Sequence, residues 1–185
     1  MKSTPDNQAP AEFISRGEVR LTRLLPGPIE RIWEYLTDPE KRARWFAGGV
    51  TEQRAGGKIE FVMHHAKIAP GETPPEQYKH VQDPGVSFEG KVRRCEPPRL
   101  LVFTFGSEDS EVTFELTPQG KQVLLIVTHR STGEDMPEIT NYASGWHIHF
   151  SLLIALLEEK PLPPFWSAHA RLKPAYDEAH HQQFK

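Results

Sequence analysis

Histidines are the residues of this 185-residue chain with the clearest capacity for chemistry, and His129 is the foremost of them. It ends a run in which Val123, Leu125 and Val127 alternate with other side chains. Period-two alternation places these four residues on one face of a strand, which we expect to point inward. An imidazole there could orient a ligand or move a proton, so His129 is the candidate catalytic residue. A structural histidine satisfied by backbone groups fits the same position.

Paired histidines raise the question of a metal site. His147 and His149 lie two residues apart in a helical pattern, whereas helical ligand pairs need spacings of three or four. The neighbours His64 and His65 would point to opposite faces of a strand. We therefore expect no metal and no other cofactor.

Nucleophilic catalysis also lacks a recognisable motif. Cys95 is the only cysteine, which excludes an intramolecular disulfide and a cysteine-based metal cluster. The chain has no Gly-x-Ser-x-Gly elbow, no phosphate-binding glycine loop and no dinucleotide fingerprint. These absences favour a protein that is not an enzyme.

Charge and hydropathy exclude two classes of partner. The 22 Lys and Arg against 25 Asp and Glu leave a formal charge of −3, without the basic excess that binds nucleic acid. No apolar run is long enough to cross a bilayer, and the first eleven residues contain no apolar signal segment. We expect a cytoplasmic protein without stable membrane insertion.

The elements that would position these residues begin after a polar segment, residues 1–16, which we expect to be a disordered or extended tail. Residues 18–24 alternate as a strand does. Residues 28–37 have helical spacing, with Pro28 suited to a first helical turn, and Asp38-Pro39 is a typical start of a second short helix.

Further strands and one long helix follow. Residues 139–159 repeat apolar side chains at spacings of four, three and four, as a helix does. Connections of hairpin length predict an antiparallel sheet. We therefore predict an α+β fold in which a curved sheet of about six strands wraps a long C-terminal helix. The further strands are expected at residues 58–63, 86–94, 100–105, 111–117 and 123–130.

Several short motifs occur in an order that resembles a known family. They are residues 28–33 with 36–39, Trp45-Phe46, Gly56-Gly57-Lys58, residues 98–105, Thr128-His129 and Gly145-Trp146. Together they cover roughly residues 17–158 and resemble the START-like superfamily, also called SRPBCC or helix-grip. Within it, the chain is most similar to the branch of homologues of the activator of the heat-shock-protein-90 ATPase. The resemblance implies a pocket between sheet and helix that takes lipids, sterols, polyketides or other apolar ligands.

Apolar and aromatic residues on the inward faces are the candidate ligand-binding set. For any single one of them, filling the core is the favoured role, because aromatic side chains dominate packed interiors. The candidates are Trp45, Phe46, Phe61, Met63, Phe88, Phe103, Phe105, Phe114, His129, Tyr142, Trp146, His149 and Phe150.

Two segments depart from the family pattern. Residues 64–85 form an insertion whose Tyr78 and Val81 could hold it over the pocket as a lid, and a plain solvated excursion fits the same segment equally well. Residues 159–185 form a C-terminal extension, and we expect residues 163–180 to cover the outer sheet face or a second subunit in a homodimer. The chain has nothing like the separate N-terminal domain with which eukaryotic chaperone activators stimulate the ATPase.

Three functions therefore follow from the sequence. The first is binding of a small hydrophobic or aromatic ligand between the sheet and the long helix. The second is a polyketide cyclase or aromatase that uses His129 as acid or base in the same cavity. The third is a chaperone-associated interaction module of the ATPase-activator kind.

Overall fold

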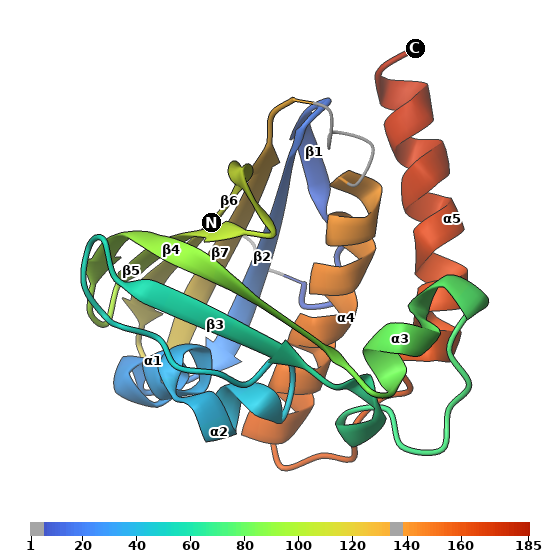
Figure 1. The fold of residues 1–185 in the computed structure, drawn as a ribbon. Coiled ribbons are helices and arrows are strands. Elements are labelled where there is room, and N and C mark those ends of the chain that lie inside the picture. The colour runs from blue at the N-terminus through green and yellow to red at the C-terminus, as the bar shows by residue number, and fades with distance from the viewer. Residues whose placement is uncertain (1–5, 134–138) are drawn as a thin grey trace.

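A seven-stranded antiparallel sheet curves around one long helix, α4 (Ile139–Leu157), in this computed structural model, which describes residues 6–133 and 139–185 (Figure 1). The α+β helix-grip prediction is confirmed. The strands follow the order β1-β2-β7-β6-β5-β4-β3. Their bounds are β1 Glu12–Ser15, β2 Glu18–Pro26, β3 Lys58–Met63, β4 Val86–Glu96, β5 Leu100–Phe105, β6 Ser107–Gln119 and β7 Gln122–Ser131.

The seventh strand, β1, corrects the prediction of a tail over residues 1–16. Residues 1–5 lie outside the described part of the chain, but β1 pairs with β2. The Asn7 side chain also exchanges two hydrogen bonds, of 2.7 and 2.8 Å, with the backbone of Leu24. These contacts satisfy backbone groups along the edge of β2, which explains why a polar segment is ordered there.

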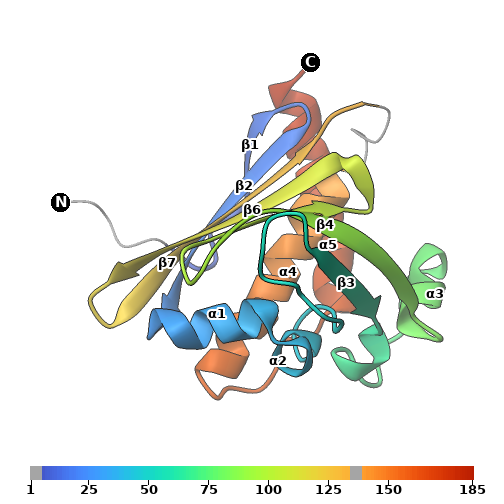
Figure 2. The same ribbon diagram turned by 60° about the vertical axis from the view of Figure 1, so that its left-hand side comes forward.

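Two short helices follow β2, as the sequence predicts: α1 (Ile29–Thr37) and α2 (Pro39–Ala43) (Figure 2). Asp38 Oδ1 accepts hydrogen bonds from the backbone N–H groups of Glu40 and Lys41, at 3.0 and 2.8 Å. Asp38 is therefore the N-cap of α2, and Pro39 occupies the first helical position.

Alternation along β6 and β7 points the expected side chains inward. Val112, Phe114 and Leu116 of β6 are buried, and Phe114 lies opposite Val127 of β7. His129 faces the same side and is fully buried. The inner face of the sheet thus meets α4.

The sheet covers only one side of α4, and α5 (Trp166–Gln183) lies alongside the other (Figures 1 and 2). Trp146 packs against Phe114 of the sheet, whereas His147 hydrogen-bonds the Tyr176 hydroxyl of α5 at 2.7 Å. The extension therefore does not cover the outer sheet face, which corrects that expectation. A helix with apolar side chains on both sides needs a second cover, and α5 supplies it.

The insertion between β3 and β4 contains three short helical pieces: the 3-10 turns His65–Lys67 and Glu76–Tyr78, and α3 (Lys79–Gln82). Residues 72–75 between them have no regular structure. The insertion lies next to the beginning of α5 (Figure 1). Among the described residues, no helix combines the length and the apolar character that crossing a membrane requires.

Candidate functional site

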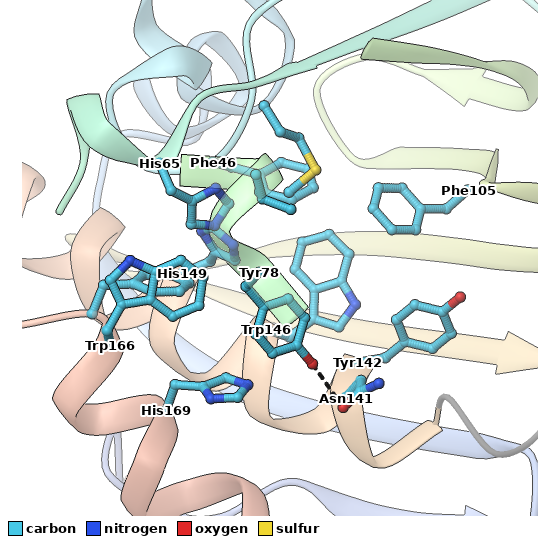
Figure 3. A pocket seen from close by; sticks show the side chains of 14 residues that line it. Phe46, His65, Tyr78, Phe105, Asn141, Tyr142, Trp146, His149, Trp166 and His169 are labelled. Atoms are coloured by element: carbon cyan, nitrogen blue, oxygen red, sulfur yellow. Dashed lines mark hydrogen bonds between the residues drawn. The ribbon is translucent and has the colours of Figure 1, made fainter. Parts of the chain in front are cut away.

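A pocket of about 230 Å³ lies where α4, the insertion and the first turn of α5 meet (Figure 3). Its wall is aromatic and contains three histidines. The lining residues are Phe46, Met63, His65, Tyr78, Val81, Phe105, Asn141, Tyr142, Gly145, Trp146, His149, Phe165, Trp166 and His169.

The candidate residues from the sequence divide into two groups. Those that line this pocket are Phe46, Met63, Phe105, Tyr142, Trp146 and His149. Those that lie in the core behind it are Trp45, Phe61, Phe88, Phe103, Phe114, His129 and Phe150.

Aromatic packing explains why the second group is not at the pocket. The Phe61 ring centroid lies 5.0 Å from those of Phe88 and Phe105 and 5.6 Å from that of Phe103. Trp45 packs on Phe150 with a centroid separation of 5.1 Å. These rings fill most of the space between sheet and helix at the separations that aromatic pairs prefer. The free volume is therefore displaced toward the insertion.

The turn after α2 positions Phe46. Trp45 is fully buried and its indole N–H donates to the Tyr35 carbonyl oxygen at 2.9 Å, so Trp45 does not cover the pocket mouth as the sequence suggested. Phe46 points into the pocket instead, with ring centroids 4.9 Å from Trp146 and from His149.

A buried arginine holds the loop that follows Phe46. The Arg42 guanidinium donates to the carbonyl oxygens of Ala47, at 2.7 Å, and of Gly48 and Gly49, both at 2.9 Å. It also donates to the Thr51 hydroxyl at 2.7 Å. Burial lowers the pKa of Arg42 to about 10, so the group keeps its charge at neutral pH. One side chain thus satisfies several backbone carbonyls beside the site.

His129 is committed to internal hydrogen bonds. Its Nδ1 accepts from the Trp146 indole N–H at 3.0 Å, which leaves the proton on Nε2, 2.8 Å from the Ser110 hydroxyl. The Tyr142 ring stacks on it with centroids 3.9 Å apart. Burial lowers the pKa of His129 to about 3. Both nitrogens serve the core, and neither faces the pocket.

The insertion and the extension are joined by a polar contact at the pocket edge. Glu72 accepts hydrogen bonds from the backbone N–H groups of Phe165, Trp166 and Ser167, at 2.6, 3.0 and 3.2 Å. The indole N–H of Trp166 donates to Gln82 Oε1 at 2.7 Å. A carboxylate at a helix N-terminus is favourable, so Glu72 caps α5 from a distant segment.

Tyr78 and Val81, which the sequence suggested as a lid, lie in the pocket wall. The Tyr78 ring stacks on Trp166, with centroids 5.6 Å apart, and its hydroxyl donates to Asn141 Oδ1 at 3.3 Å (Figure 3). The insertion thus closes one side of the pocket by contacts with both α4 and α5.

Sequence reasoning missed the pocket residues of the C-terminal extension and His65. The available signal was in the long helix, where Ile148, Leu152 and Ala155 form a second apolar row at helical spacing. That row predicts a cover for this side of α4. Phe165 and Trp166 are among the apolar residues of the extension that could supply it.

The pocket histidines are neutral at physiological pH. Burial lowers the pKa of His149 to about 4 and that of His65 to about 3, and it also lowers the pKa of His169. Within residues 6–133 and 139–185, no three His, Cys, Asp or Glu side chains converge as a metal site would require.

Comparison with known proteins identifies one matching family and several structures with the same fold. A family model described as "Activator of Hsp90 ATPase homolog 1-like protein" matches residues 26–158. The protein encoded by gene BPP1335 from Bordetella parapertussis is 39% identical, with a TM-score of 0.75 over 88% of this chain and 85% of that one. None of the curated proteins matches this chain significantly.

Two more distant structures share the fold. CalU16 from Micromonospora echinospora is 23% identical with a TM-score of 0.62, and the match covers 93% of this chain and 95% of that one. DynU16, described as a protein of the dynemicin biosynthetic locus, is 24% identical with a TM-score of 0.61, over 81% of this chain and 51% of that one. The extent of the family match and the 39% identity over most of the chain lead to one conclusion: this protein belongs to the family of Activator of Hsp90 ATPase homolog 1-like proteins, of the SRPBCC type.

Proposed function

We propose that the protein binds a small aromatic ligand of one or two rings in the pocket between α4, the insertion and α5. The observation that carries this proposal is an aromatic-walled space of about 230 Å³ with Gly145 in its wall. Ligand sites are typically apolar concavities with a few polar groups, and SRPBCC folds typically bind hydrophobic ligands.

Gly145 supports the proposal because packing gives no other reason for it. It lies inside α4, where glycine costs about 0.5–1 kcal/mol relative to alanine. A Cβ atom built on it would meet no other described atom within 4 Å beyond the neighbouring residues and backbone of its own helix. A larger side chain would therefore enter the pocket, and glycine keeps that volume free.

The volume restricts the size of the ligand. An apolar protein cavity of about 150 Å³ is enough for benzene, whereas drug-sized ligands occupy roughly 300–1,000 Å³. A space of about 230 Å³ thus suits one ring or two fused rings. A sterol or a polycyclic polyketide would require the insertion to move.

Titration with 2-methylnaphthalene, followed by calorimetry or by the fluorescence of Trp146 and Trp166, tests the proposal. Gly145→Leu should fill the pocket, weaken binding at least about tenfold and leave the protein folded. Gly145→Ala is the matched control, because it adds one methyl group and should retain binding. Failure of the unaltered protein to bind the probe would refute the proposal.

The same variants separate this proposal from the two other functions that the sequence suggests. An enzyme of the cyclase kind would convert the compound that it binds. If a compound is recovered with the protein, mass spectrometry before and after incubation would detect that conversion. A chaperone-associated module would bind its partner protein equally well after Gly145→Leu has filled the pocket.

A further inference from the structure

The position of the ring proton on His149 determines whether this side chain can donate or accept a hydrogen bond in the pocket. His149 Nδ1 lies 2.7 Å from the carbonyl oxygen of Trp45. A carbonyl oxygen only accepts, so Nδ1 must carry the proton and donate it. Because His149 is buried and neutral, Nε2 then holds a lone pair. No described residue hydrogen-bonds to Nε2, and His149 lines the pocket.

A second histidine with a ring nitrogen unpaired by any described residue lies next to His149. His65 is 3% exposed, and its Nδ1 is buried without a partner among the described residues. Its ring centroid lies 5.3 Å from that of His149, and it also packs against Trp166 (Figure 3). The Phe165 ring packs edge-on against His65 as well. A buried polar group without a partner is costly, because it has lost its hydrogen bonds to water.

Several other polar groups of the wall already have partners. The indole N–H of Trp146 donates to His129, and that of Trp166 donates to Gln82. The Tyr78 hydroxyl donates to Asn141. His169 packs edge-on against the rings of Tyr78 and Trp166, away from His65 (Figure 3). His65 and His149 are thus two adjacent polar groups in an aromatic wall, one an acceptor and one able to donate.

We propose that the ligand is a hydroxyl-substituted aromatic compound whose hydroxyl group lies between these two histidines. This inference rests on the proposed binding function. The hydroxyl donates to Nε2 of His149 and accepts the N–H of the neutral His65 ring, so both of its hydrogen-bonding capacities are used. The aromatic body contacts the ring faces of the wall. His65 and His149 are specificity-determining residues in this assignment.

Two probes of similar shape test the assignment on the unaltered protein. We expect 2-naphthol to bind about tenfold more tightly than 2-methylnaphthalene, because a hydrogen bond contributes about 1–1.5 kcal/mol. Hydrophobicity alone would favour the methyl compound, so a preference for the naphthol requires the polar contact. Equal affinities, or tighter binding of 2-methylnaphthalene, would overturn this inference and leave the proposed function intact. Binding of neither probe would refute the proposed function itself.

Variants and a spectroscopic signal assign the contact to each histidine. His65→Phe should reduce the ratio of the affinities for 2-naphthol and 2-methylnaphthalene at least about threefold, whatever its effect on either affinity alone. Because His149 also hydrogen-bonds the backbone of Trp45, replacing it would disturb the core. Its contact with the ligand is therefore measured in the unaltered protein, from the ¹⁵N chemical shift of its Nε2. That shift should move with 2-naphthol and stay nearly constant with 2-methylnaphthalene. An unchanged preference in His65→Phe, or an unchanged shift with 2-naphthol, would overturn the role of the residue concerned.

Discussion

The carboxylate of Glu72 accepts a hydrogen bond of 2.6 Å from the backbone N–H of Phe165, 93 residues away in the chain. Phe165 precedes α5 and has no side chain that could cap the helix. An insertion between two strands thus completes the N-terminus of a helix that forms another wall of the same pocket. This relationship makes the pocket a joint product of the insertion and the C-terminal extension.

Removing the charge at Glu72 should loosen this wall. Glu72→Gln weakens the hydrogen bonds to Phe165 and Trp166 and removes the favourable interaction with the helix dipole. We expect a loss of about 1 kcal/mol in the free energy of unfolding and faster hydrogen exchange at the start of α5. Glu76→Gln, on the exposed part of the insertion, is the control. Equal rates of hydrogen exchange at the start of α5 in the two variants would show that Glu72 does not cap this helix.

The His129–Trp146 pair should show strong energetic coupling. His129→Leu leaves the Trp146 indole N–H and the Ser110 hydroxyl without their partner in the core, at an expected cost of about 3 kcal/mol. Adding Trp146→Phe removes one of these orphaned groups, so the double variant should be less destabilised than the sum of the single variants. Urea unfolding of the full cycle measures the coupling, which we expect to exceed about 1 kcal/mol. Additive losses would mean that the hydrogen bond contributes little.

Arg42 should not tolerate its usual conservative replacement. Lysine keeps the charge but cannot reach several carbonyl oxygens as the planar guanidinium does. We expect Arg42→Lys to destabilise the protein by roughly 3 kcal/mol and to weaken binding of 2-methylnaphthalene, because Phe46 precedes the loop that Arg42 holds. Arg44→Lys, at an exposed position one residue beyond α2, should change stability by less than about 0.5 kcal/mol. Similar thermal unfolding of both variants would contradict this role of Arg42.

The free energy of unfolding should decline as the pH falls below the pKa of an ordinary histidine. Burial lowers the pKa values of His65 and His129 to about 3 and those of His147 and His149 to about 4. The unfolded chain, with histidine pKa values near 6.5, therefore binds more protons in this range. The stabilisation is fully present above pH 6.5 and is lost as the pH falls toward 4 and then 3.

Urea unfolding at several pH values between 7.5 and 4.5 measures this linkage. Each such histidine should contribute about 1.4 kcal/mol per pH unit in the middle of the range. His147→Gln keeps a partner for the Tyr176 hydroxyl and should reduce the slope by one proton. His181→Gln, at an exposed position on α5, is the matched control. An unaltered slope in His147→Gln would contradict the depressed pKa of that residue.

Much of the architecture was determined by the sequence alone, because strands and helices follow from local periodicity and capping. Alternation identified the inward faces of β6 and β7, including that of His129. Asp38-Pro39 marked the start of α2, and the spacing of Trp146 and Phe150 marked α4. The family resemblance followed from the same short motifs.

Only the tertiary structure decided where the pocket lies and which polar groups in its wall have partners. Free volume depends on how rings such as Phe61 and Phe103 pack together, and close packing makes that a property of the whole core. The path of the C-terminal extension likewise depends on which apolar face remains uncovered once the sheet has closed on α4. The tautomer of His149 depends on a carbonyl oxygen 104 residues away, and no local pattern in the chain encodes that contact.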